Sequence, residues 1–391
     1  MSDWDALLEQ LAEVPRENGT PGLHQTARFL YDTFDASGFP VDLVPFTAHP
    51  YALRLTGVIA LVGGLLYLRW VRAGRHAAAL GVAVVLPVLI LAQLELYWPV
   101  FGWIGAEQQH HVAVRLPARE ASQRLVFTAH YDTKTDVLDH LERAPVDLLA
   151  LPAIAVMLIG ALAALWAPRV PARAPLLLRL SAFAGWTAAI FGAATFVTMS
   201  AGAFAPSRSP GALDNGASCA ALVRLVELLA AGPPLERTDV EVVLLSAEEV
   251  GVQGSRQFAA ERFASPPDLP TAVVNLEGVG GTDHLAVLGG ERTFVRRFAP
   301  DPALVALMDR LHRERYGGPL EITDVAGATD ARSFLARGVA AATLISREPG
   351  QLFWRGLHSS HDDRSRVDIE ALEETVAYLV SLVRSADSDG W

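Results

Sequence analysis

Charge and cysteine are both scarce in this 391-residue sequence. Charged residues make up 19% of the chain against 51% hydrophobic residues, and the mean hydropathy is +0.28. This balance is too apolar for a typical soluble enzyme and too polar for membrane spans alone, so we expect a protein that is part membrane and part globular. The single cysteine, Cys219, excludes an internal disulfide and leaves the cellular compartment open.

Positive charge is in deficit as well, because 32 Lys and Arg face 43 Asp and Glu, for a formal net charge of −11. The lack of a basic surface argues against nucleic acid as a partner. The first residues, MSDWDALLEQLAEVPREN, have neither a basic start nor an apolar core. We therefore expect no cleavable signal peptide, so that any export depends on internal spans.

Four apolar stretches are each long enough to cross a bilayer core, and they fall into two pairs, at 53–71 with 77–98 and at 147–167 with 180–200. The alternative is a set of buried core helices, and Gln93 and Glu95 weaken the second stretch slightly. The paired arrangement favours two transmembrane hairpins. We expect a multi-pass integral membrane protein that contacts the lipid bilayer through four transmembrane helices.

Arginines are concentrated in and beside the short loop inside each hairpin, at Arg69, Arg72, Arg75, Arg169, Arg173 and Arg179. Short loops rich in Lys and Arg stay cytoplasmic. The rest of the chain is therefore predicted on the extracytoplasmic side, although Arg54, Arg143 and Arg208 also flank the spans there.

The remainder of the chain has an α/β pattern. Strand-like runs occur at HHVAVRL, RLVFTAH, DVEVVLLSA, TAVVNLEG and AATLIS, and helix-like segments separate them. Fully apolar strands that alternate with helices predict a mostly parallel central sheet sandwiched by helices. We expect a globular domain in three parts, with the hairpins as insertions: 1–50, 106–145 and 202–391 for the domain, and 51–105 and 146–201 for the hairpins.

Acids and histidines follow the strand-like runs, where sheets of this kind place their ligand sites. The segments are AHYD (His130, Asp132), GALDNGAS (Asp214, Asn215), LLSAEEVGVQGS (Glu248, Glu249), VVNLEGVGG (Glu277) and GLHSSHDDRSRVD (His358, His361, Asp362). Each segment alone has a plain structural reading, such as a helix N-cap or a solvated acid pair. Together, two histidines and three carboxylates suit a pair of zinc ions and leave one carboxylate as a general base.

The order of these motifs resembles the di-zinc aminopeptidase family, which includes bacterial leucyl aminopeptidases and the membrane metallopeptidases of vacuoles and the endoplasmic reticulum. The family pattern is His-x-Asp, Gly-Ala-x-Asp-Asn, Glu-Glu, Asn-Leu-Asp/Glu and a late His-Thr/Ser-x-x-Asp. RENGTPGLHQTARFL near the start and GATDARSFLARGVAAATLIS before the last histidine extend the similarity. The resemblance implies a zinc exopeptidase-like fold and a hydrolase of the metallopeptidase class that acts on peptides.

The resemblance also implies a role for each residue. Asp214 would bridge two zinc ions, His130 and Glu277 would complete one metal site, and Glu249 with His358 the other. Glu248 would be the general base and Asp132 would accept the second ring N–H of His130. His361 is then an outer-shell or surface residue.

Two other functions stay open from the sequence alone. One is a glutaminyl cyclase-like enzyme of the same fold that uses a single zinc ion. The other is a catalytically inactive membrane scaffold, against which the complete ligand set and Glu248 argue. A transporter function has less support, because Glu95 is the one plausible acidic residue within the four apolar stretches. The substrate side chain and the oligomeric state also stay open.

Overall fold

The computed structural model describes residues 4–96, 100, 102, 104–293, 296–324, 327–348 and 354–391. The chain divides into two compact units, which are described separately. The first unit comprises Met1–Ala48, Ala106–Lys134 and Ser207–Trp391, and the second comprises His49–Gly105 and Thr135–Pro206. Each unit is thus assembled from segments that lie far apart in the sequence.

The first unit is built on an eight-stranded sheet with the strand order β1-β2-β4-β3-β5-β10-β6-β9. The strands are β1 Val41–Ala48, β2 Glu107–Leu116, β3 Gln123–His130, β4 Thr238–Leu245, β5 Thr271–Glu277, β6 Leu285–Leu288, β9 Glu321–Thr323 and β10 Ala340–Ser346. The four central strands β4, β3, β5 and β10 run parallel. Antiparallel pairs join β1 to β2, β2 to β4 and β6 to β10. A separate short ribbon pairs β7 Glu291–Arg292 with β8 Arg297–Phe298.

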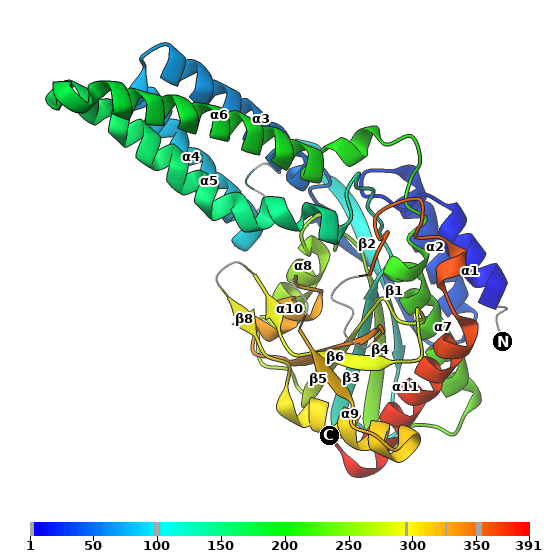
Figure 1. The fold of residues 1–391 in the computed structure, drawn as a ribbon. Coiled ribbons are helices and arrows are strands. Elements are labelled where there is room, and N and C mark those ends of the chain that lie inside the picture. The colour runs from blue at the N-terminus through cyan, green and yellow to red at the C-terminus, as the bar shows by residue number, and fades with distance from the viewer. Residues whose placement is uncertain are drawn as a thin grey trace. The chain divides into compact units, whose positions relative to one another are not determined.

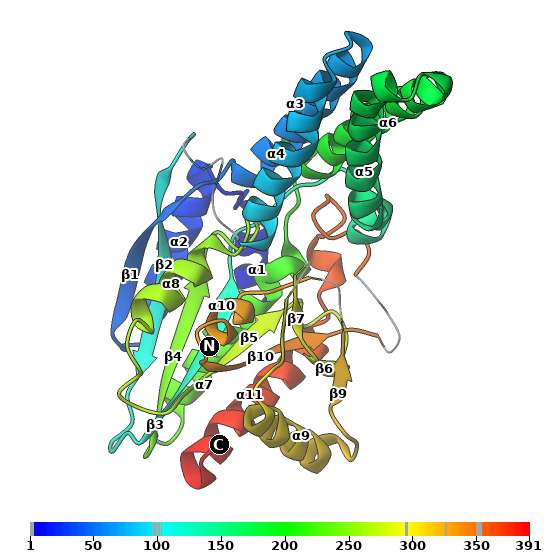
Figure 2. The same ribbon diagram turned by 90° about the vertical axis from the view of Figure 1, so that its left-hand side faces the viewer.

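Helices cover both faces of this sheet (Figure 1, Figure 2). Side chains alternate along a strand, so Phe127 of β3 packs into one buried cluster and its neighbour Val126 into another. The larger cluster joins the sheet to α1 Trp4–Glu13, α2 Pro21–Asp35, α7 Ala217–Ala231, α9 Pro302–Tyr316 and α11 Ile369–Asp389. The smaller cluster joins the other face to α8 Gln253–Arg262 and α10 Ala331–Leu335. The predicted fold class is confirmed.

The second unit contains four long helices, which are α3 Ala52–Arg72, α4 His76–Glu95, α5 His140–Trp166 and α6 Ala174–Met199. All four are long and apolar enough to cross a membrane. Helix α5 begins earlier than the apolar stretch 147–167 that predicted it, because Asp139 and Glu142 form a capping box at its start. Single 3-10 turns follow at Ala167–Arg169, Pro171–Arg173 and Ala201–Phe204.

Small residues bring α3 and α6 into close contact. A Cβ atom added to Gly64 would lie 2.3 Å from the carbonyl oxygen of Ala188, and one added to Gly192 would lie 2.5 Å from that of Ala60. Tyr67, which is fully buried, donates from its hydroxyl group to the Met157 carbonyl of α5 at 2.6 Å. Close backbone approach through small residues is typical of helix pairs in membranes.

Candidate metal centre

The parallel strands bring five of the seven predicted site residues to one edge of the sheet, and Asp132 is among them because it follows the end of β3 by two residues. His130 is the last residue of β3 and Glu277 the last of β5, while Glu248 and Glu249 follow β4. Because β3, β4 and β5 are parallel neighbours, their carboxyl ends meet at the same edge.

The other predicted ligands come from connecting segments of the same unit. Asp214 lies in the short turn Ala212–Gly216 that precedes α7, and its peptide bond to Asn215 is cis. His358 lies between β10 and α11 and has a left-handed backbone with φ of 59°. A non-glycine residue in this region is strained and is held there by its surroundings.

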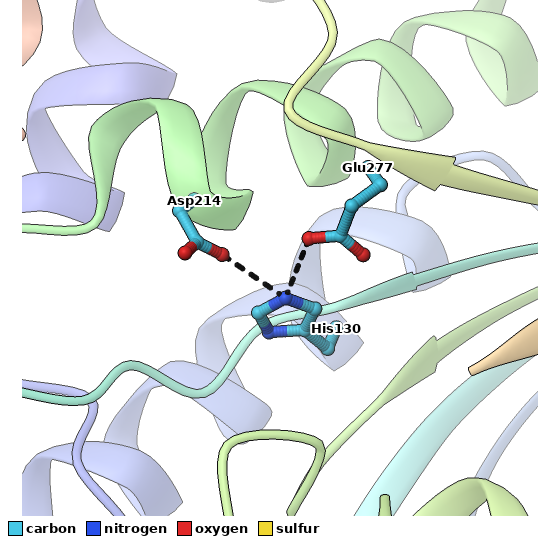
Figure 3. A group of neighbouring side chains, drawn as sticks. All are labelled: His130, Asp214 and Glu277. Atoms are coloured by element: carbon cyan, nitrogen blue, oxygen red, sulfur yellow. Dashed lines mark hydrogen bonds and ion pairs between the residues drawn. The ribbon is translucent and has the colours of Figure 1, made fainter. Parts of the chain in front are cut away.

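Asp214 lies between the two histidines. The Nε2 atom of His130 lies 3.2 Å from Asp214 Oδ1 and 3.2 Å from Glu277 Oε1, as Figure 3 shows. On the other side, Nε2 of His358 lies 3.1 Å from Asp214 Oδ2 and 3.1 Å from Glu249 Oε1. Each carboxylate oxygen of Asp214 therefore faces a different histidine and a different second acid.

These contacts define two adjoining groups of donors, His130–Asp214–Glu277 and Asp214–Glu249–His358, each with its ligand atoms within 4.8 Å of one another. Glu277 Oε2 is buried without a hydrogen-bond partner among the described residues. Burying a carboxylate oxygen without a partner is costly, and bound cations are one way in which proteins offset that cost. The donor types, imidazole nitrogen and carboxylate oxygen, are those that zinc accepts.

Charge within the cluster shifts the pKa values of its members in opposite directions. Burial alone would lower the pKa of His130, but Glu277, Asp132 and Asp214 together raise it well above its usual value. Burial would likewise raise the pKa of Asp214, yet His130 and His358 hold it well below its usual value. Burial raises the pKa of Glu248 well above that of an ordinary glutamate, against the opposing effect of His130. Perturbed pKa values of this kind gather at functional sites.

Asp132 holds the turn that carries the two neighbouring glutamates. Its Oδ1 accepts from the backbone N–H of Glu248 at 3.2 Å and its Oδ2 from that of Glu249 at 3.1 Å. The preceding Ala247 has φ of 63°, which turns the chain sharply at the end of β4. The Nδ1 atom of His130 lies 3.1 Å from the backbone carbonyl of Asp132 and 3.6 Å from its carboxylate, so the carbonyl is the nearer partner.

Several residues that support the cluster were not assigned this role from the sequence. Asn215 donates to the carbonyl of Leu276 at 2.9 Å and accepts from Gly278 N at 3.2 Å, on either side of Glu277. Asp362 accepts from Leu213 N at 2.9 Å and from Asp214 N at 3.1 Å, and burial raises the pKa of Asp362 to about 6.

Arg16 and Asn18, from the segment RENGTPG, also reach the cluster from the other end of the chain. Their residue types gave a weak signal, because arginine and asparagine side chains are mostly exposed to solvent. His361 is exposed, as expected for an outer-shell or surface residue.

The fold and the cluster together define an α/β protein with two adjoining groups of candidate metal ligands. Residues 194–383 match the family model described as peptidase family M28. This segment includes Asp214, Glu248, Glu249, Glu277 and His358, and the match confirms the resemblance drawn from the motifs. The match to this family supports a zinc-dependent metallopeptidase as the class of enzyme.

Solved structures of similar fold include both peptidases and cyclases. The Legionella pneumophila LapA aminopeptidase is 13% identical, with a TM-score of 0.55 over 99% of this chain and 71% of that one. A Zn-dependent exopeptidase from Parabacteroides distasonis is 13% identical, with a TM-score of 0.56 over 97% and 96%. The Porphyromonas gingivalis glutaminyl cyclase is 12% identical, with a TM-score of 0.56 over 98% and 96%. At these identities the likeness shows the fold alone. No curated protein matches the sequence.

Proposed function

We propose that this protein is a membrane-anchored aminopeptidase that holds two zinc ions per chain. The observation that carries the proposal is the position of Asp214, whose two carboxylate oxygens each face a different histidine. A carboxylate shared in this way is what a two-metal site requires. The match to peptidase family M28 supports peptide hydrolysis as the reaction.

In this proposal each residue has one task. His130 and Glu277 would hold one zinc ion, Glu249 and His358 would hold the other, and Asp214 belongs to both groups of candidate ligands. Asp132 fixes the turn that carries Glu248 and Glu249 through its two backbone hydrogen bonds. When bound, the two metals would polarise the scissile carbonyl and lower the pKa of a water held between them.

Glu248 would take the proton from that water and return it to the leaving amine. A carboxylate suits this task when its pKa is raised toward neutrality, because it can then both accept and donate the proton near pH 7. Burial raises the pKa of Glu248 in this direction. A general base of this kind contributes roughly 10²- to 10⁴-fold to the rate.

The second unit supports anchoring in a lipid bilayer. Its helices expose large apolar side chains around their outer surfaces, and examples with more than 60% of their surface exposed are Leu148, Leu151, Leu176, Phe183 and Ile190. Apolar surface of this extent needs a cover, and a bilayer provides one for helices of this length. We propose that α3, α4, α5 and α6 each cross the membrane.

A glutaminyl cyclase-like activity is the second candidate, because cyclase structures match the fold as well as the aminopeptidase structures do. A single-zinc enzyme needs only one of the two ligand groups. Both groups are complete here, which favours the two-metal aminopeptidase.

The test uses full-length protein purified in detergent, assayed on aminoacyl substrates and on peptides with amino-terminal glutamine. The aminopeptidase proposal predicts zinc-dependent release of the first residue, and a loss of roughly 10²- to 10⁴-fold in kcat for Glu248→Gln. The matched control is Glu314→Gln, which alters an exposed acid on α9 and is expected to keep full activity. Cyclisation without hydrolysis would establish the second candidate instead. Zinc-independent or absent turnover of both substrates would contradict both.

A further inference from the structure

Arg16 is a fully buried arginine that lies beside the metal-ligand cluster without being one of its ligands. Its guanidinium group donates three hydrogen bonds, from Nε to the Tyr131 carbonyl at 2.7 Å, from Nη1 to the Pro210 carbonyl at 2.9 Å, and from Nη2 to the Gly211 carbonyl at 2.8 Å. Tyr131 follows His130 directly, and Gly211 precedes Asp214 by three residues. One side chain therefore joins the loop after β3 to the turn that carries the shared acid.

The backbone around Arg16 adds to this connection. The Arg16 carbonyl accepts from Thr133 N at 3.1 Å, and Asn18 donates from Nδ2 to Asp132 Oδ2 at 2.6 Å. We call Arg16, Glu17 and Asn18 the amino-terminal strap. The strap thus reaches the His-x-Asp loop at Tyr131, Asp132 and Thr133.

The turn that contains Gly211 is packed closely against Thr133 and Arg16. Gly211 has φ of 61°, and a Cβ atom there would lie 2.3 Å from Thr133 Cγ2 and 2.9 Å from Arg16 Nη2. The Gly211 carbonyl also accepts from Gly216 N at 3.0 Å, which closes the turn around Asp214. The guanidinium group is a rigid fork of donors, so it fixes the separation of the carbonyls that it binds.

We propose that the strap, through Arg16, positions the two ligand loops of the metal centre and sets the spacing between His130 and Asp214. This inference rests on the proposed function, since it assumes that the cluster binds metal. Arg16 is a positioning residue in this account. It acts through Tyr131, Pro210 and Gly211, and none of its three hydrogen bonds goes to a proposed ligand.

The charge of Arg16 and its proposed positioning role predict opposite effects on metal affinity when Arg16 is replaced. The inference can therefore be tested. Arg16 is a cation near Asp132, Asp214 and Asp362. By charge alone, its replacement with a neutral residue would remove a repulsion and strengthen the binding of a metal cation. If Arg16 positions the ligand loops, the same replacement weakens binding, because outer-shell partners of ligands typically contribute roughly 10- to 100-fold to metal affinity.

The experiment measures zinc affinity by competition with a chelator, on full-length protein in detergent, for the wild type, Arg16→Met and Arg16→Lys. Circular dichroism confirms that each variant is folded at the assay temperature. The control is Arg28→Met, an exposed arginine of α2 whose partner is Asp32. We expect Arg16→Met to bind zinc roughly 10- to 100-fold more weakly than wild type. Arg16→Lys should also be weaker, because lysine keeps the charge but not the fork, and the control should be unchanged.

A folded Arg16→Met variant with equal or tighter zinc binding would overturn the inference, while zinc binding by the wild type would still stand. Failure of the wild type to bind zinc would instead contradict the proposed function. If neither Arg16 variant folds, Arg16→Gln becomes the test, because its amide can still donate to a backbone carbonyl but lacks the guanidinium fork that joins the two loops. Weaker zinc binding in folded Arg16→Gln would then support the inference, and unchanged binding would overturn it.

Discussion

At the scale of single residues, a buried acid outside the metal centre holds a polar network on the sheet. Glu291 has 2% of its surface exposed and accepts from Thr329 N at 2.6 Å, Thr329 Oγ1 at 2.9 Å and Thr343 Oγ1 at 2.7 Å. Asn275 of β5 donates to Thr329 at 3.1 Å and so joins the network to the strand that ends at Glu277. Burial raises the pKa of Glu291 above its usual value, against the lowering effect of its hydrogen bonds.

This shift predicts a pH dependence of stability. A carboxyl group whose pKa is higher in the folded state binds more protons folded than unfolded, so its contribution to stability falls as pH rises. The decline begins near the unfolded pKa of about 4.3 and ends above the folded pKa. We expect the free energy of unfolding of wild type, relative to Glu291→Gln, to decrease across this window, as measured by denaturant unfolding at several pH values. A difference that stays constant with pH, or rises, would contradict the assignment.

Residue type and position after a strand predicted a metal site at this edge of the sheet, and the resemblance to the aminopeptidase family supplied the role proposed for each ligand. His130 and Glu277 end strands, and Glu248 and Glu249 follow one. A parallel sheet therefore predicts that these residues meet at one edge. The supporting contacts could not be predicted in the same way. The bond between Arg16 and Gly211 joins residues 195 positions apart, and no local pattern in the sequence encodes such a pairing.

At the scale of elements, long apolar strands were predictable, and the short strands at and next to one edge of the sheet were not. The buried strands β3, β4, β5 and β10 carry continuous apolar runs, which are typical of a parallel sheet. Strands β6 and β9 have four and three residues, too few for a period to show, and tertiary pairing alone defines them. Among the helices, the capping box at Asp139 could be recognised only once the start of α5 was known.

The contact between α3 and α6 gives a prediction about helix packing. Gly64→Ala would place a methyl group 2.3 Å from the Ala188 carbonyl, so the helices must separate or bend. Overpacking of this kind costs roughly 1–3 kcal/mol. The control is Gly81→Ala in α4, where an added Cβ atom meets nothing within 4 Å. We expect a lower thermal unfolding midpoint in detergent for Gly64→Ala alone, and equal midpoints for the two variants would contradict close packing of α3 on α6.

At the scale of the whole molecule, the arginine-rich loops predict the orientation in the membrane. Six arginines lie in or beside the loops between α3 and α4 and between α5 and α6. The only cysteine, Cys219, is fully buried and donates to the His130 carbonyl at 3.1 Å, so it gives little background in thiol labelling. From the positive-inside rule we predict that these loops lie in the cytoplasm and the first unit outside.

Single exposed cysteines test this orientation in intact cells. We expect a membrane-impermeant maleimide to label Ala121→Cys in the first unit and to leave Ala172→Cys in the α5–α6 loop unlabelled until the membrane is permeabilised. Both positions are exposed, so permeabilised cells provide the control for reactivity. The reverse labelling would place the first unit in the cytoplasm, and labelling of both sites in intact cells would argue against a membrane-spanning second unit.

The most direct test of the two-metal centre is the zinc content of wild type and three ligand variants, measured by elemental analysis after exposure to limited zinc. The account predicts about two zinc ions per chain in wild type and about one in Glu277→Gln and in Glu249→Gln, since each variant alters one ligand group. Asp214→Asn should lose both, because its carboxylate belongs to both groups. One zinc ion in wild type, or an Asp214→Asn variant that loses no more zinc than Glu277→Gln, would contradict a shared Asp214.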